Sequence, residues 1–180
     1  KNYMDDWLKQ DTIIDLNIEE NRFVDFNFQS MLPIKFSQNG PVIATVDIDK
    51  NGWDDLIVGT PQGIFTKIGF KSDQSIRWVE LEGSAAFEDQ GLLVFDADND
   101  NDRDIFVASG GYESFPNSIQ LRNRLYINDG NSNFSIKSDA VPAINQNSSV
   151  ARGSDYDNDG DIDLFIGGDV YPKKYPLADQ

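Results

Sequence analysis

The stretch DYDNDGDIDL (155–164) places five aspartates on alternate positions, with a single glycine among them. Two other stretches share this pattern, DIDKNGWDDL (47–56) and DADNDNDRDI (96–105). Counted from the first Asp, all three have Asp at positions 1, 3 and 9, Asp or Asn at position 5, and Leu or Ile at position 10. Position 6 is Gly or Asn, the residue types that best tolerate the left-handed backbone of a tight loop. The first residues of the three stretches lie 49 and 59 residues apart, so the chain contains an internal repeat.

The segments around each acidic stretch have the composition of buried β-strands. They are short apolar runs rich in Val, Ile and Phe and bounded by turn residues. The runs that directly flank the acidic stretches are VIATV (42–46), LIVG (56–59), LLVF (92–95), IFVAS (105–109) and LFIGG (164–168). Further strands are expected in GIFTKI (63–68), RWVELE (77–82) and RLYIND (124–129), with a weaker candidate in SSVARGS (148–154) and an alternating one in FVDFNF (23–28).

Each repeat therefore reads as strand, acidic loop, strand, loop, strand, turn and strand over about 50 residues, which is the pattern of a β-propeller blade. We expect an all-β fold with blades of four antiparallel strands, about three of them, as part of a larger propeller, because propellers close with about 4–8 blades. The expected division is an N-terminal segment of undefined structure (1–35), a blade with the first acidic loop (36–87), a blade with the second (88–147) and a partial blade with the third (148–180).

Composition excludes several classes of function. The 180 residues carry a net charge of −16, which argues against nucleic acid as a partner because phosphates attract basic surfaces. The chain has no cysteine and no histidine, so disulfides, zinc sites with Cys or His ligands, and Cys or His catalysis are excluded within it. It also contains no run of about 18 apolar residues that predicts a transmembrane helix. Of the 31 acidic residues, 14 lie in the three acidic stretches, which indicates a site.

The spacing of oxygen-bearing side chains in each stretch fits a calcium ion, a hard cation that takes six to eight oxygen ligands. Side chains at positions 1, 3, 5 and 9 and the backbone carbonyl at position 7 can wrap such an ion. We expect about three calcium ions, one per loop. The expected ligands are Asp47, Asp49, Asn51, the carbonyl of Trp53 and Asp55 in the first loop; Asp96, Asp98, Asp100, the carbonyl of Asp102 and Asp104 in the second; and Asp155, Asp157, Asp159, the carbonyl of Asp161 and Asp163 in the third.

Three other interpretations of the loops are weaker. An EF-hand needs a bidentate Glu at position 12, where this chain has Val58, Val107 and Ile166, and it joins helices instead of strands. Magnesium demands a stricter octahedron and keeps its waters. Plain acidic turns without a metal remain an alternative, which three copies in the same register disfavour.

The residues also resemble a known family. DxDx(D/N)GxxDL followed by Gly59-Thr60-Pro61 is similar to the FG-GAP, or VCBS-type, repeat of integrin α-subunit propellers, whereas the second and third copies depart from the Gly-Ala-Pro pattern. FSQNGPVIATVDIDKNGWDDLIVG (36–59) and EDQGLLVFDADNDNDRDIFVASGG (88–111) resemble large secreted bacterial proteins related to cartilage acidic protein. The resemblance implies calcium-binding loops on a propeller and a bacterial protein that is extracellular or on the cell surface, including attachment to the outer membrane.

From these features we expect a calcium-stabilised module for protein interaction or scaffolding, without enzymatic activity. Its expected partner is another part of a longer chain, or a separate protein, that completes the propeller. The insert 110–123, with Tyr112, Phe115 and Arg122, is one candidate surface, although its aromatic side chains can equally pack beneath the loop.

The alternative function is a carbohydrate-binding module or a polysaccharide-active enzyme on a propeller scaffold. A glycan could stack on the aromatic side chains of Trp53, Trp78 and Tyr126. The carboxylates outside the loops form no recognisable catalytic pair in the sequence; they include Glu80, Glu82, Glu88, Asp89 and Glu113.

Overall fold

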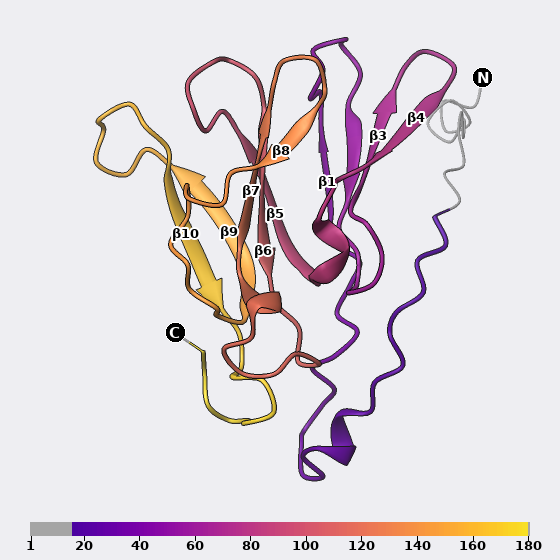
Figure 1. Ribbon diagram of the computed structural model, residues 1–180, viewed down its shortest axis with the longest axis vertical. Helices are drawn as coiled ribbons and strands as arrows, with labels where there is room; N and C mark the ends of the chain where they lie inside the picture. The colour runs from indigo at the N-terminus through magenta and orange to yellow at the C-terminus, as the bar shows by residue number, and fades with distance from the viewer. Residues whose placement is uncertain (1–15, 180) are drawn as a thin grey trace, which may run out of the picture.

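The computed structural model describes residues 16–179, which form three antiparallel sheets side by side (Figure 1). Three short 3-10 helices lie between the strands, at Asp25–Asn27, Ser84–Ala86 and Ile119–Leu121. The strands of the described residues are β1 (Ile43–Val46), β2 (Asp55–Val58), β3 (Lys67–Lys71), β4 (Ile76–Glu80), β5 (Asp89–Phe95), β6 (Asp104–Ser109), β7 (Arg124–Asn128), β8 (Phe134–Ile136), β9 (Ser148–Ser154) and β10 (Asp163–Gly168).

Two of the sheets have four strands each, in the orders β1-β2-β3-β4 and β5-β6-β7-β8, and the third has the two strands β10-β9. Each sheet begins with the same hairpin, in which an acidic loop joins the first strand to the second. The prediction of an all-β fold with blades of four antiparallel strands is therefore confirmed. Within the described residues the three sheets do not close into a ring, as expected of part of a propeller.

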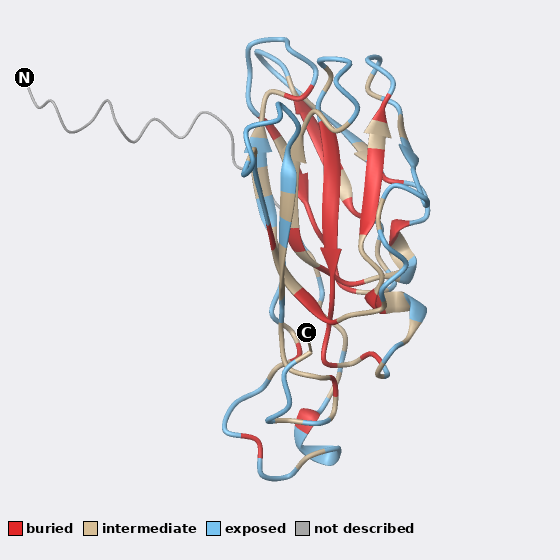
Figure 2. Cartoon of the chain, turned by 90° about the vertical axis from the view of Figure 1, so that its left-hand side faces the viewer, coloured by how far each residue is buried: buried red, intermediate tan, exposed pale blue. Residues whose placement is uncertain are grey.

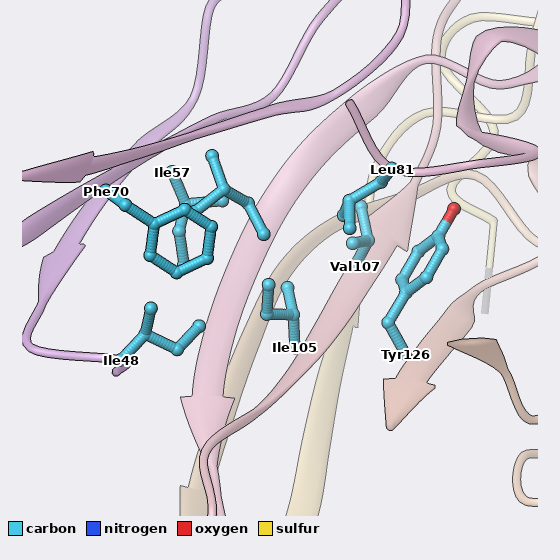
Figure 3. Packing of buried hydrophobic residues seen from close by; sticks show 8 residues of the cluster. Ile48, Ile57, Phe70, Leu81, Ile105, Val107 and Tyr126 are labelled. Atoms are coloured by element: carbon cyan, nitrogen blue, oxygen red, sulfur yellow. The ribbon is translucent and has the colours of Figure 1, made fainter. Parts of the chain in front are cut away.

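The sheets stack face to face, and the alternation of side chains along the second strand of each sheet creates the core. Ile105 and Val107 of β6 pack into one apolar cluster with Ile57 of β2 (Figure 3). Phe106, between them, points to the opposite face and packs with Ala151 of β9. Because successive side chains of a strand point to opposite faces, the middle sheet is covered on both sides.

Burial follows this order of sheets. All six residues of β6 are buried, whereas β10 alternates between exposed and half-buried residues. Figure 2 shows the molecule from the β9–β10 side, with exposed and half-buried segments in pale blue and tan and the buried strands in red at the centre. The third sheet thus has one face on the core and one face open.

Equivalent polar junctions connect consecutive sheets. Asp89, at the start of β5, accepts the backbone N–H of Thr60 at 3.0 Å, and Arg124 of β7 forms a buried ion pair with the same carboxylate. Asn147, just before β9, accepts the backbone N–H of Gly111 at 2.9 Å in the same way. Each junction therefore ties the start of the first strand of one sheet to the segment that follows the second strand of the sheet before it.

The segments outside the sheets gather at the end opposite the acidic loops (Figure 1). The stretch 23–28, for which alternation predicts a strand, contains a 3-10 helix instead. The reason is Asp25, whose carboxylate is buried and accepts the backbone N–H groups of Phe36 and Ser37 at 2.6 and 3.0 Å. In contrast, 148–154 forms a full seven-residue strand despite its polar composition. Among the described residues, no helix has the length and apolar character needed to cross a bilayer.

Candidate metal sites

Each acidic loop brings three carboxylates together at the same end of its sheet. The aspartates at positions 1, 3 and 9 each offer one oxygen, and these oxygens lie within 4.8 Å of one another. The three groups are Asp47, Asp49 and Asp55; Asp96, Asp98 and Asp104; and Asp155, Asp157 and Asp163. The structure therefore gathers nine of the side chains that the sequence marks as ligands.

The aspartate at position 1 folds the loop around itself. In the first loop, Asp47 accepts the backbone N–H groups of Asn51 and Gly52 through its two oxygens, both at 2.9 Å. Asp96 and Asp155 make the equivalent pairs of hydrogen bonds. Position 6 has a positive φ in every loop, as its Gly or Asn predicts, with 88° at Gly52. Position 4 also has a positive φ, for example 60° at Lys50, which the sequence does not signal.

The aspartate at position 9 ties the loop to the buried part of the sheet. Asp55 accepts the N–H of Ile48, at position 2 of its loop, at 2.9 Å and the N–H of Lys71, on β3, at 2.8 Å. Asp104 accepts the N–H groups of Ala97 and Asn128 at 2.7 and 2.8 Å. Burial raises the pKa of both carboxyls, and these backbone donors oppose the rise. Asp163 has only the first of the two bonds among the described residues, from Tyr156 at 2.8 Å.

The side chains at position 5 accept hydrogen bonds from the backbone of their own loop. The Oδ1 atoms of Asn51, Asp100 and Asp159 accept the N–H of the residue at position 7, at 2.8, 2.8 and 2.9 Å. Of these side chains, the carboxylates of Asp100 and Asp159 are not members of the groups of three carboxylates. The hydrogen bonds hold the position-7 residues, Trp53, Asp102 and Asp161, in place. The assignment of positions 5 and 7 as metal ligands stays a prediction.

Neighbouring loops contact each other through the same two positions of the repeat, position 4 of one loop and position 7 of the next. Lys50 Nζ, at position 4 of the first loop, lies 2.9 Å from Oδ1 of Asp102, at position 7 of the second. Asn99 Nδ2, at position 4 of the second loop, donates to Oδ1 of Asp161, at position 7 of the third, at 3.1 Å. The three acidic loops thus form one connected row.

The donor set of each loop fits a hard divalent cation. All the gathered atoms are carboxylate oxygens, which suit calcium, and the chain has no histidine or cysteine to favour a softer metal. Two unit charges about 4 Å apart repel by about 1 kcal/mol in water and about 4 kcal/mol near a protein surface. A bound cation would offset this repulsion within each group.

A further group of carboxylates lies at the opposite end of the sheets. Burial, together with the nearby charges of Glu113 and Glu20, raises the pKa of Glu88 to about 8. Burial also raises the pKa of Glu113 and of Glu20. The sequence contains no sign of this proximity, because Glu20 is 68 residues before Glu88.

The residues that the sequence suggests for an interaction surface on the insert 110–123 differ in how far they are exposed. Tyr112 is buried and donates through its hydroxyl to Gln29, whereas Phe115 is 70% exposed and lies under the ammonium of Lys173, 3.7 Å from the ring centre. The insert 110–123 thus buries one of its two aromatic side chains and exposes the other. Arg122 is half-buried and donates to Asn145.

The three aromatic candidates for sugar stacking are also unlike one another. Tyr126 is fully buried in the core, whereas Trp78 is 37% exposed and lies against Gly69. Trp53 is 42% exposed beside the first loop, with Lys71 Nζ 4.8 Å from its ring centre. Only Trp53, of these three, combines exposure with a position at the row of acidic loops.

Stacked four-stranded antiparallel sheets with an acidic loop in the first hairpin define the class of protein: a repeat protein built from propeller blades. Comparison with known families agrees. The FG-GAP repeat matches residues 39–78 and an FG-GAP-like repeat matches residues 96–166. The chain belongs to the proteins with FG-GAP-type repeats. No curated protein matches it significantly, and the similarity to proteins related to cartilage acidic protein stays a prediction.

Proposed function

We propose that this chain is a calcium-stabilised propeller module of an extracellular or cell-surface protein, and that it acts as a scaffold for protein interaction instead of as an enzyme. The observation that carries the proposal is that the same set of three carboxylates occurs three times at one end of the stacked sheets. The loops that hold these sets also contact each other.

The position-9 aspartates explain how a bound cation would act on stability. Asp55 and Asp104 belong to the carboxylate groups and also accept N–H groups from the loop and from the third strand of the sheet. A cation at these oxygens would hold loop and sheet in one arrangement, so its binding energy becomes folding energy. The expected role of calcium is therefore structural.

The proposed extracellular location is supported by the family and is compatible with the calcium chemistry of the loops. Extracellular calcium modules work with dissociation constants of about 10⁻⁴–10⁻³ M, so permanent occupancy needs no exceptional affinity. FG-GAP repeats are typical of extracellular and cell-surface proteins. The bacterial and outer-membrane assignment rests on the resemblance of residues 36–59 and 88–111 alone.

A binding role also agrees with the carboxylates outside the loops. Glu88, whose pKa burial raises to about 8, is 5% exposed and lies against Gly111. A general acid must reach its substrate, and a buried carboxyl covered by backbone does not. The second candidate function is glycan binding, favoured by the exposed ring of Trp53 beside the first acidic loop.

The test is thermal unfolding of the purified chain across a calcium titration, with EDTA and magnesium as controls and elemental analysis for bound metal. We expect a large rise of the midpoint that calcium produces and magnesium does not. No rise, together with no bound calcium, would mean that the loops are solvated turns and would overturn the proposal. Screening polysaccharides for binding and for turnover separates the scaffold from the glycan-binding and enzymatic alternatives.

A further inference from the structure

The first acidic loop differs from the other two at position 5, where an asparagine is followed by glycine. The chain contains two Asn-Gly pairs, Asn39-Gly40 and Asn51-Gly52. In such a pair the glycine nitrogen can attack the asparagine side chain, because glycine has no Cβ that hinders a close approach. The second and third loops have Asp100 and Asp159 at position 5. Loss of ammonia from Asn51 would give the first loop an acidic residue there as well.

The reaction needs only the chain and water. The nitrogen of Gly52 bonds to Cγ of Asn51, the Cγ–Nδ2 bond breaks, and the proton of the glycine N–H leaves with Nδ2 as ammonia. Water then opens the cyclic imide that has formed. Opening at Cγ gives aspartate, whereas opening at the main-chain carbonyl gives isoaspartate, whose backbone passes through the side-chain CH₂. The net change is asparagine and water to aspartate or isoaspartate and ammonia.

The closed loop keeps the reacting groups apart. The N–H of Gly52 donates to Oδ2 of Asp47 at 2.9 Å. The side chain of Asn51 donates through Nδ2 to the main-chain oxygen of Lys71 at 2.7 Å and accepts the N–H of Trp53 through Oδ1 at 2.8 Å. The attacking nitrogen and the side chain that it must reach are thus bound to different partners. These bonds must open before the reaction can begin.

Packing adds no protection at this site. Asn51 and Gly52 are exposed, and a Cβ added at Gly52 would meet no atom within 4 Å. The pair Asn39-Gly40 is also exposed, and Asn39 donates through Nδ2 to the carbonyl of Phe36 at 2.8 Å. Among residues 16–179, however, the N–H of Gly40 has no hydrogen-bond acceptor. The two pairs therefore differ in whether the glycine N–H is held.

Asp47 connects the protection of Asn51 to the metal site. It belongs to the first group of three carboxylates, and it accepts the N–H groups of Asn51 and Gly52, both at 2.9 Å. An ionised carboxylate has about four lone-pair sites, so it can bind a cation and accept these bonds together. A cation that fixes Asp47 would therefore also keep the nitrogen of Gly52 away from Cγ of Asn51.

We propose that Asn51 is a modification site, which loses ammonia when the first loop opens and which a divalent cation bound in that loop protects. Aspartate at position 51 loses the hydrogen bond to Lys71, and the longer backbone of isoaspartate displaces Gly52 from Asp47. A reversible opening of the loop would thus become a permanent change. The inference rests on the proposed function for the role of calcium, and it adds a regulation of the first site.

The test follows both asparagines in one sample. The 180-residue chain is kept at neutral pH with saturating calcium, with EDTA, and with EDTA in guanidinium chloride, and peptide mass spectrometry measures conversion. In guanidinium chloride Asn39 and Asn51 should convert at similar rates, because both are unfolded. In calcium Asn51 should convert about tenfold or more slowly than Asn39, since local opening must come first. In EDTA alone Asn51 should convert faster than in calcium.

Two variants separate the loop from general stability. In EDTA, Asp47→Ala removes the acceptor of the Gly52 N–H and should speed conversion of Asn51 by about tenfold or more, as expected for a lost hydrogen bond to a charged group. Asp96→Ala is the matched control, because Asp96 accepts the equivalent N–H groups in the second loop. It should leave the rate at Asn51 unchanged. Equal acceleration in both variants would overturn the proposal.

Two results with the original chain would also overturn it: conversion of Asn51 as fast as that of Asn39 in calcium, or no conversion of Asn51 in guanidinium chloride where Asn39 reacts. Equal rates of Asn51 in calcium and in EDTA would overturn protection by the cation. If calcium raises the melting midpoint of the same samples, that failure belongs to this inference. If the midpoint is unchanged, the calcium proposal itself has failed.

Discussion

The middle sheet and the β9–β10 sheet begin with the same acidic loop and differ in almost everything that surrounds it. Asp104 and Phe106 are fully buried, whereas Asp163 and Phe165, at the same positions of the repeat, are exposed. The hydrogen bonds at positions 1 and 5 of the two loops are nonetheless the same. The comparison shows that the loop determines its own backbone, while burial comes from the third strand and from the next sheet.

The largest expected effect tests burial at position 11. Phe106→Ala should lower the free energy of unfolding by about 3–5 kcal/mol, because it empties a packed site between two sheets. Phe165→Ala should change it by less than about 0.5 kcal/mol, as surface substitutions usually do. Urea unfolding of both variants in the same buffer measures the difference. Similar losses in the two variants would mean that Phe165 is covered in solution.

The second prediction concerns pH and the residue before each junction. Glu88 precedes Asp89, whereas the neutral Gln146 precedes Asn147 at the entry to β9. The pKa of Glu88 is about 8 in the folded chain and near 4.5 when it is unfolded. Between these values the unfolded chain loses its proton first, so stability should fall with rising pH by up to about 1.4 kcal/mol per unit and level off above about pH 8.

Glu88→Gln gives the middle sheet the same neutral residue that precedes the junction of the third sheet. It should remove the part of the pH dependence that arises from Glu88. Stability curves of the variant and the original chain, measured from pH 5 to pH 9, should therefore diverge as the pH rises. Parallel curves would show that the carboxyl of Glu88 is already ionised in the folded protein.

The third prediction separates the position-9 aspartates in the absence of metal. Both oxygens of Asp104 accept backbone N–H groups, so Asp104→Asn places an amide NH₂ against one donor and should cost about 1–3 kcal/mol. Asp163 uses one oxygen, so the amide of Asp163→Asn can turn its NH₂ to solvent, with a cost below about 0.5 kcal/mol. Thermal unfolding in EDTA checks this, and a larger loss for Asp163→Asn would contradict it.

The smallest effect concerns the contacts between loops. Lys50→Gln should lower stability by no more than about 1 kcal/mol, the usual range of an exposed ion pair, and less at high salt. Asn158 has the same place in the third loop and no following loop among the described residues, so Asn158→Gly, which keeps the positive φ without strain, serves as the control. If both variants lose the same stability, the Lys50 contact contributes nothing specific.

Much of the fold could be predicted from the sequence because its signals are local. The apolar runs at 42–46, 56–59 and 105–109 coincide with strands, and Gly52 and Gly160 occupy the left-handed positions that a tight loop requires. The repetition of the acidic stretch predicted the blades, because one hairpin repeated at intervals of about 50 residues is typical of propeller blades.

The features missed by sequence reasoning depend on residues that are distant along the chain. Lys50 and Asp102 are 52 residues apart, and nothing near either residue indicates their contact. The raised pKa of Glu88 arises from its burial with Glu113 and Glu20. Asp25 breaks the alternation at 23–28 because its carboxylate binds the backbone of residues 36 and 37.

The contact from position 4 of one loop to position 7 of the next has a consequence for how such a chain can evolve. The second repeat carries both halves of the contact, with Asp102 facing the repeat before it and Asn99 facing the repeat after it. A duplicated repeat would therefore arrive with its neighbour contacts already encoded, and an array could lengthen by one unit without any change elsewhere. Lys50–Asp102 and Asn99–Asp161 would then be descendants of one ancestral pair whose first member has since diverged.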